Sequence, residues 1–94
     1  MRLRAKVDSN HREIVSALRD AGASVQSLAQ IGRGVPDLLV GWRGKNFCFE
    51  VKDKSKKPSE RELTTDEKAW HYAWTGQVCV IETVEDAFKV LECF

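Results

Sequence analysis

Three stretches of the chain carry apolar residues at the spacing of an amphipathic helix. Each begins with a residue that can cap a helix, Asn10, Thr64 or Thr83, and an acidic residue three positions later completes a capping box. The first stretch covers about residues 9–21, and the second stops at Gly76. The pattern therefore predicts three helices, of which the last is short.

Four apolar stretches with a shorter period predict strands. Residues 46–52 alternate most clearly, and residues 36–42 form the strand before them, with a hairpin turn at residues 43–46 between the two. A weaker strand is expected within residues 23–30. Residues 78–81 form a continuous apolar run, which is typical of a strand buried on both faces.

The resulting order is helix, three strands, helix, strand and helix. This αβββαβα order predicts an α/β or α+β sandwich with a mixed sheet. The polar segment 53–63 is expected to be a mobile loop. The chain has 94 residues, with no internal repeat and no linker, so residues 1–94 are expected to form a single domain.

Composition excludes several classes of protein. With 43% hydrophobic and 31% charged residues, the chain is neither disordered nor collagen-like, and its apolar runs are far shorter than the roughly 20 residues of a membrane span. The basic start of the chain, residues 1–6, is followed by polar residues and not by the apolar region of a signal peptide. Cys48, Cys79 and Cys93 form no C-x-x-C pair and are not expected to make bridges or bind zinc. We therefore expect a cytoplasmic protein without membrane contact.

The net charge of +1 conceals an uneven distribution. Residues 1–57 carry twelve Lys and Arg against six Asp and Glu, whereas residues 58–94 carry three against eight. Lys52 is followed closely by Lys54, Lys56 and Lys57. This basic cluster indicates either a polyanionic partner or a solvated lysine-rich loop, and charge alone does not separate the two.

The candidate chemistry lies on the two strands of the predicted hairpin. Asp37 directly follows Pro36 at the start of one strand, and Glu50 and Lys52 share a face of the next. Pairing of the strands brings the two carboxylates and the ammonium group together. Two carboxylates suit Mg²⁺, and a metal ion with a nearby lysine suits phosphodiester hydrolysis. The alternative is an amphipathic strand with Glu and Lys on its outer face. That alternative leaves the spacing to Asp37 unexplained.

These residues resemble the PD-(D/E)xK nuclease superfamily, and more narrowly its virus-type replication-repair nuclease (VRR-NUC) group. The resemblance covers Gly-Arg-Gly-Val-Pro-Asp-Leu-Leu-Val at 32–40, Phe-Glu-Val-Lys at 49–52 and Leu-Thr-Thr-Asp-Glu at 63–67. It implies a restriction-endonuclease-like (tRNA-endonuclease-like) fold, with a central mixed sheet flanked by helices, and a DNA endonuclease that depends on Mg²⁺ or Mn²⁺. Stand-alone phage and bacterial members are associated with branched DNA such as four-way (Holliday) junctions. The implied setting is phage replication, or DNA repair and recombination, in a bacterial or phage-infected cell.

Carried across by position, the resemblance makes Asp37 and Glu50 metal ligands, together with the backbone carbonyl of Val51. It makes Lys52 the catalytic lysine. Glu13 matches an acidic residue that many members place near the metal, and its alternative role is to complete the capping box with Asn10.

Glu67 stands where many members have glutamine. It could bind a second metal or orient the attacking water, or only close the capping box with Thr64. Trp70 and Trp74 are expected in the core or an interface, and His71 on the surface.

Phosphate contacts are expected from Arg33, Lys54, Lys56 and Lys57. We also expect a twofold homodimer, because one such site cuts one strand and a four-way junction needs two matched cuts. The competing interpretations are a nuclease for flaps or other substrates, a non-catalytic nucleic-acid-binding module, and a plain interaction domain.

Overall fold

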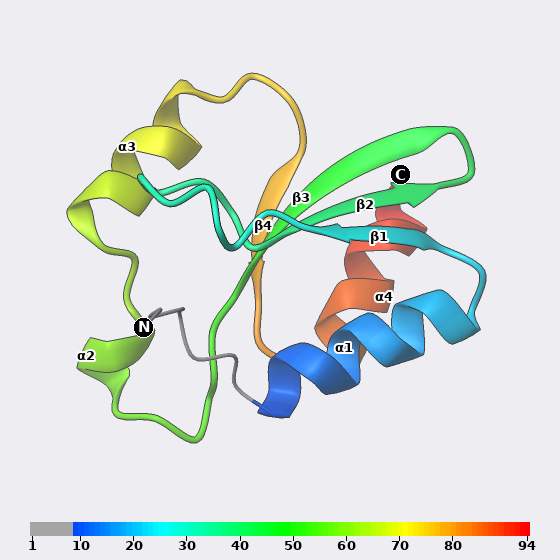
Figure 1. Cartoon of the computed structure of the whole chain (residues 1–94), viewed down its shortest axis with the longest axis horizontal. Coiled ribbons are helices and arrows are strands. Elements are labelled where there is room, and N and C mark those ends of the chain that lie inside the picture. The colour runs from blue at the N-terminus through cyan, green and yellow to red at the C-terminus, as the bar shows by residue number, and fades with distance from the viewer. Residues whose placement is uncertain (1–8) are drawn as a thin grey trace.

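A computed structural model describes residues 9–94 of the chain (Figure 1), so the expectation about residues 1–6 lies outside the described residues. In chain order the elements are α1 (Ser9–Asp20), β1 (Ser24–Ser27), β2 (Leu38–Trp42), β3 (Lys45–Val51), α2 (Pro58–Arg61), α3 (Thr65–Ala73), β4 (Val78–Ile81) and α4 (Val84–Cys93). The α/β class and the predicted elements are confirmed. The short helix α2 was not predicted. Pro58 suits its first position, and the Glu60 side chain accepts from the Lys57 N–H at 3.3 Å.

The four strands form one mixed, open sheet in the order β1-β2-β3-β4, with only β3 and β4 parallel. The β2–β3 hairpin closes through Arg43 and Gly44, whose φ angles of 52° and 81° fit a two-residue turn between twisted strands. The expectation that residues 78–81 are buried on both faces was wrong. β4 is an edge strand, and Val80 is 44% exposed because only one face of the strand packs on the core.

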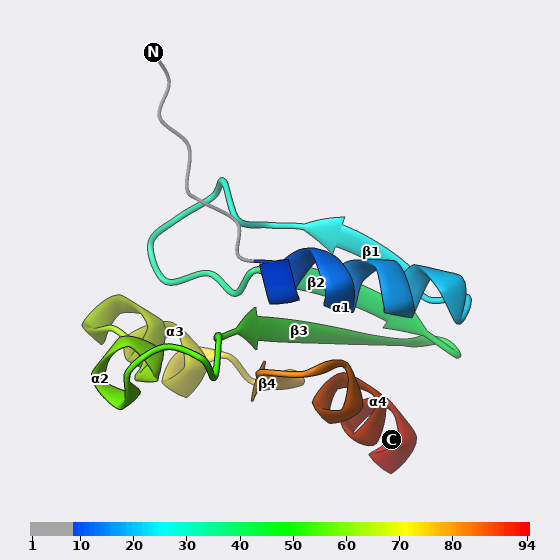
Figure 2. The ribbon, with the colours of Figure 1, turned by 90° about the horizontal axis from the view of Figure 1, so that it is seen from below.

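The hydrophobic core lies on one face of the sheet, where α1 and α4 pack below it in Figure 1. Figure 2 shows the same layers from below, with α2 and α3 beyond the end of β3. The core residues are Ile14, Leu18, Ala23, Leu38, Val40, Phe47, Phe49, Ile81, Ala87 and Leu91. Because side chains alternate along a strand, Glu50 and Val80 lie on the opposite face. Among the described residues, no helix has both the length and the apolar character needed to cross a membrane.

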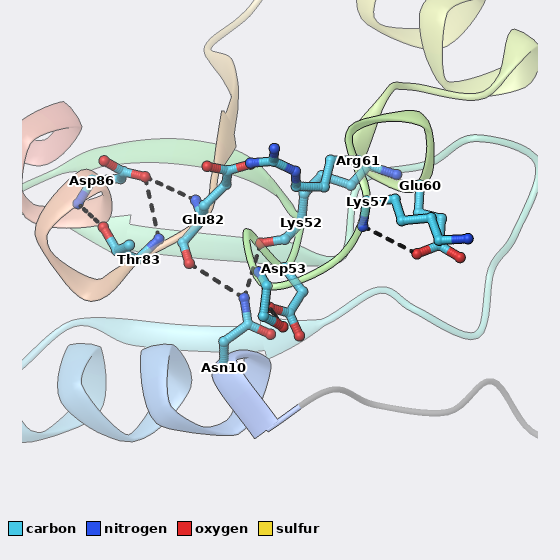
Figure 3. Close-up of polar contacts among 10 residues, drawn as sticks. Asn10, Lys52, Asp53, Lys57, Glu60, Arg61, Glu82, Thr83 and Asp86 are labelled. Atoms are coloured by element: carbon cyan, nitrogen blue, oxygen red, sulfur yellow. Dashed lines mark hydrogen bonds and ion pairs between the residues drawn. The ribbon is translucent and has the colours of Figure 1, made fainter.

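Asn10 does not cap α1 as predicted. It lies inside the first turn, and its amide Nδ2 donates to the backbone carbonyls of Lys52, at 2.9 Å, and Glu82, at 3.3 Å. Figure 3 shows this amide between the ends of β3 and β4. Asn10 thus ties α1 to both parallel strands and fixes the backbone that carries the Lys52 side chain. The predicted box of Thr83 and Asp86 at α4 is confirmed.

The segment between β1 and β2 reaches across to α3 (Figure 1). Its base is closed by the Leu28 N–H, which donates to the carbonyl of Asp37 at 2.7 Å. At its turn, Gly32, Arg33 and Gly34 all have positive φ angles, of 74°, 59° and 81°. Gly34 lies directly against the backbone of Asp66 in the first turn of α3. The glycine turn therefore sets how closely α3 approaches the sheet.

We expect Gly34→Ala to displace α3 and to destabilise the fold more than Gly32→Ala does. Both changes place a Cβ on a left-handed backbone, which costs about 1–2 kcal/mol. Only at Gly34 would the new Cβ also collide with the backbone of α3, whereas nothing lies within 4 Å of a Cβ at Gly32. Urea denaturation of the two variants measures the difference. Equal losses would show that the approach of Gly34 to Asp66 is unimportant.

Candidate active site

Four of the predicted site residues meet at one end of the sheet. Asp37 precedes β2, and the pairing of Leu38 with Phe49 places it beside Glu50 near the end of β3. Lys52 follows β3 directly, and its Nζ lies 3.8 Å from Glu50 Oε2 and 2.9 Å from Glu67 Oε1. Glu67 comes from the first turn of α3. The hairpin and α3 thus bring three carboxylates and one ammonium group together.

The Asp37 side chain is fixed by the backbone of β3. Its Oδ2 accepts a hydrogen bond from the Val51 N–H at 2.7 Å, while its own carbonyl closes the base of the 28–37 segment. Val51 therefore contacts the site through its backbone N–H group. The role of its carbonyl as a metal ligand stays a prediction. This double anchoring aims one carboxylate at the end of β3.

Among residues 9–94, Glu50 is the one charged residue that is buried, at 4% exposure. Its Oε1 has no hydrogen-bond donor in the described part of the chain. Burial raises the pKa of Glu50 to about 9, and the charge of Asp37, a hydrogen bond to Asp37 and the charge of Glu67 act in the same direction, against Lys52. The three carboxylates therefore outnumber the one ammonium group, and the raised pKa of Glu50 favours its protonated form when no cation is bound.

Glu67 closes the predicted capping box with Thr64 and also bonds Lys52, a contact that the sequence did not predict. Its Oε1 accepts from the Thr64 N–H and from Lys52 Nζ, both at 2.9 Å, and the Thr64 side chain accepts from the Glu67 N–H at 3.2 Å. Burial opposes ionisation, but the hydrogen bonds from Thr64 and Lys52 outweigh it and lower the pKa of Glu67. The capping carboxylate of α3 therefore also holds the lysine.

His71 lies closer to this site than the sequence suggested. It follows Glu67 by one helical turn, is half-buried, and its Nε2 is buried without a hydrogen-bond partner among the described residues. Burial lowers the pKa of His71, and the charges of Glu67 and Lys52 act on it as well. The i, i+4 spacing from Glu67 was the available signal. No spacing in the sequence linked Asn10 to Lys52, although the Asn10 side chain donates to the Lys52 carbonyl.

The other predicted residues lie outside this cluster. Glu13 is exposed on α1 and is not among the charges that act on Glu50. Arg33 is exposed at the turn of the 28–37 segment. Lys54, Lys56 and Lys57 are exposed on the segment that follows β3.

The fit of a metal ion depends on the Asp37–Glu50 pair. Within residues 9–94, no group of three or more His, Cys, Asp or Glu side chains is arranged to hold a metal. Mg²⁺ usually takes only one or two carboxylates and completes its shell with water and phosphate, so a pair is sufficient. A divalent cation would also supply the charge that the buried Glu50 lacks. The residues present therefore fit Mg²⁺, and the same oxygen ligands suit Mn²⁺.

Comparison of the chain with protein-family models, with curated proteins and with solved structures gives no match. The assignment of a function therefore depends on the chemistry of this site and on the motifs that carry its residues.

Proposed function

We propose that the protein is a metal-dependent endonuclease that hydrolyses phosphodiester bonds of DNA. The observation that carries the proposal is the Asp37–Glu50 pair, in which Glu50 is buried with an unpartnered Oε1, beside a lysine held by a third carboxylate. In this proposal Asp37, Glu50 and the carbonyl of Val51 hold Mg²⁺. When bound, the cation would polarise a phosphoryl oxygen and lower the pKa of a water molecule.

Lys52 performs the remaining chemistry in this proposal. Its ammonium group would orient the attacking water or offset the negative charge that develops on the phosphoryl oxygens. Glu67 Oε1, 2.9 Å from Nζ, and the Asn10 amide on the Lys52 carbonyl hold that group in place. Positioning of this kind is worth a large share of catalysis.

We further propose that the fold is restriction-endonuclease-like, of the VRR-NUC type. The mixed four-stranded sheet with flanking helices supports this, as do the positions of the motifs on β2, β3 and α3. We propose branched DNA, such as a four-way junction, as the substrate. Recognition by DNA shape suits a single small domain, and phosphate contacts from Arg33, Lys54, Lys56 and Lys57 would position the strands.

Cleavage of labelled duplex, flap and four-way-junction DNA, with Mg²⁺, with Mn²⁺ and with a chelator, tests the proposal. Metal-dependent cuts in the junction, absent with the chelator, are the expected result. Cleavage of flaps alone would support the nuclease function but would replace the four-way junction with a flap as the proposed substrate. Tight binding of every substrate without cleavage in either metal would refute the nuclease and favour a non-catalytic nucleic-acid-binding module.

Two arginines provide a matched test of the phosphate contacts. Arg33 and Arg43 are both exposed and both have positive φ angles, but Arg43 lies at the opposite end of β2, over Trp42. Replacing either arginine with glycine relieves the same backbone strain at a positive φ angle and removes one positive charge. We expect Arg33→Gly to weaken DNA binding and to reduce its log–log salt slope by about one unit, and Arg43→Gly to leave both unchanged. Identical slopes for the two variants in a salt titration would remove Arg33 from the interface.

We also propose that a twofold homodimer is the active species. Phe94 is 54% exposed beside Lys45, at the end of β3 far from Glu50, and a second copy would cover apolar surface there without closing the site. Light scattering of the protein alone and on a junction measures the mass. A mass near 10.7 kDa in both cases would contradict the dimer.

A further inference from the structure

Trp70 and Trp74 are not in the core, which was one of the two places that the sequence suggested, and their place in an interface stays a prediction. None of the residues of α3 is buried, and Trp74, which caps the helix, is 48% exposed. The two indole rings are stacked, with centroids 4.6 Å apart and planes inclined by 17°. A stacked aromatic pair held at the surface is costly to expose and is typical of a contact site.

The stack is held in one conformation by its surroundings. The Trp74 N–H donates to the Trp70 carbonyl at 3.0 Å, which ends the helix. The Trp70 ring also meets the His71 ring edge to face, with centroids 6.2 Å apart. Gly76 lies so close to the Trp74 indole that a Cβ there would be 2.8 Å from Nε1. Trp70 stacks on the Trp74 ring and Gly76 lies against the same indole, but Trp74 is still 48% exposed, so part of the side chain is open to a ligand.

The stack lies on the same side of α3 as the candidate active site. Residues 67, 70, 71 and 74 are three or four positions apart and therefore share one helix face. The rise per residue places Trp74 about 10 Å along the helix from Glu67, a distance of about three nucleotides at the B-form spacing. Glu67 in turn bonds Lys52. A DNA strand with its phosphate at Lys52 would thus pass the stack within a few nucleotides.

We propose that Trp74, backed by Trp70, is a stacking platform for an unpaired base of the DNA strand that is cut. This inference rests on the proposed nuclease function for the identity of the ligand. Every base offers a flat face to an aromatic ring, so such a platform selects for unpaired bases without reading sequence. Bases inside a duplex are already stacked, whereas the strands at a junction or flap offer free ones. The platform would therefore contribute to a preference for branched DNA.

The polar residues beside the stack favour a nucleic acid over a protein partner. Lys52, Glu67 and His71 lie on the side of α3 that carries the stack. A protein that covered Trp74 would also cover these groups and close the site. A single strand can instead place a base on the ring and a phosphate near the lysine.

The first test measures binding without catalysis. A short oligothymidylate is titrated into the metal-free protein, and both tryptophan fluorescence and affinity are followed. We expect quenching with the wild type, about a tenfold loss of affinity in Trp74→Ala, and partial rescue in Trp74→Phe. Tyr72→Ala is the matched control, because Tyr72 is an aromatic residue of the same helix, 93% exposed, and lies outside the shared face. Equal affinities of Trp74→Ala and Tyr72→Ala would overturn the platform.

The second test places the base. Single abasic sites are introduced at successive positions of a branched substrate, and the affinity is measured for the wild type and for Trp74→Ala. We expect an abasic site at one position to lower the affinity of the wild type by about tenfold. The same abasic site should not lower the affinity of Trp74→Ala any further. Losses that are the same in both proteins at every position would overturn the inference. A variant that loses the dimer in light scattering, with unchanged DNA affinity, would also overturn it and assign the stack to a subunit interface.

The outcomes separate the two proposals. Cleavage of DNA with no effect of Trp74→Ala on oligothymidylate binding refutes the platform and leaves the nuclease. Quenching and position-specific loss without any cleavage supports the platform and refutes the nuclease.

Discussion

Replacing Lys52 with alanine should reduce metal-dependent cleavage by about 10²–10⁴-fold while DNA affinity changes little. Lys52 Nζ lies between Glu50 and Glu67, at 3.8 and 2.9 Å, so it is aimed at the same point as the proposed metal site. Single-turnover rates on the preferred substrate measure the loss. Lys54→Ala is the matched control, because Lys54 is an exposed lysine two residues later and should affect binding only.

The variant also removes the positive charge between two carboxylates, so its fold needs a separate check. Lys52→Ala combined with Glu67→Gln removes one charge of each sign and should recover stability without recovering cleavage. Cleavage by Lys52→Ala at the rate of the wild type would end the proposed mechanism. Recovery of cleavage in the double variant would show that Lys52 acts only through the stability of the cluster.

The part of the site that depends on the pairing of β2 and β3 could be predicted from the sequence. Alternation on residues 46–52 and the hairpin turn are local signals, and together they placed Asp37 next to Glu50 and Lys52. The contact of Glu67 with Lys52 is a tertiary one. It depends on how closely α3 approaches through Gly34, and no spacing along the chain encodes that approach.

The errors come from residues whose type suits two environments. Asn10 has the chemistry of a helix cap, but the same amide can bind two carbonyls from distant strands, and it does so here. The apolar run of β4 suits a central strand, yet within residues 9–94 no strand lies beyond it in the sheet. Trp70 and Trp74 have the spacing of a core face, but Trp70 is only half-buried and Trp74 is exposed, because α3 does not pack on the core.

The second large effect concerns the stability of the metal-free protein, which should fall as the pH rises from about 7 to 9, where the lowered pKa of His71 no longer contributes. The pKa of Glu50 is raised from 4.5 to about 9 in the folded state. Within this window the folded protein holds one more proton than the unfolded chain. The contribution is therefore complete below pH 4.5 and is lost as the pH rises through 9. The slope from one proton is at most about 1.4 kcal/mol per pH unit.

Mg²⁺ should reverse this dependence because it replaces the proton on Glu50. We expect the cation to stabilise the protein more at pH 8 than at pH 6, and its binding to release protons at neutral pH. Urea denaturation with Mg²⁺ or with a chelator, across this pH range, measures the first effect. Calorimetry in buffers of different ionisation enthalpy measures the second.

Glu50→Gln should remove both effects, since the amide fills the same space and can donate to Asp37 without titrating. Its metal-free stability should no longer fall between pH 7 and 9, above the range in which His71 titrates, and Mg²⁺ should stabilise it little. Glu13→Gln is the matched control, because Glu13 is exposed on α1 and does not act on Glu50, and it should behave as the wild type. A wild-type stability that rises with pH in the chelator, or that responds equally to Mg²⁺ at pH 6 and 8, would mean that Glu50 is ionised without metal. The unpartnered carboxylate would then no longer support a cation site.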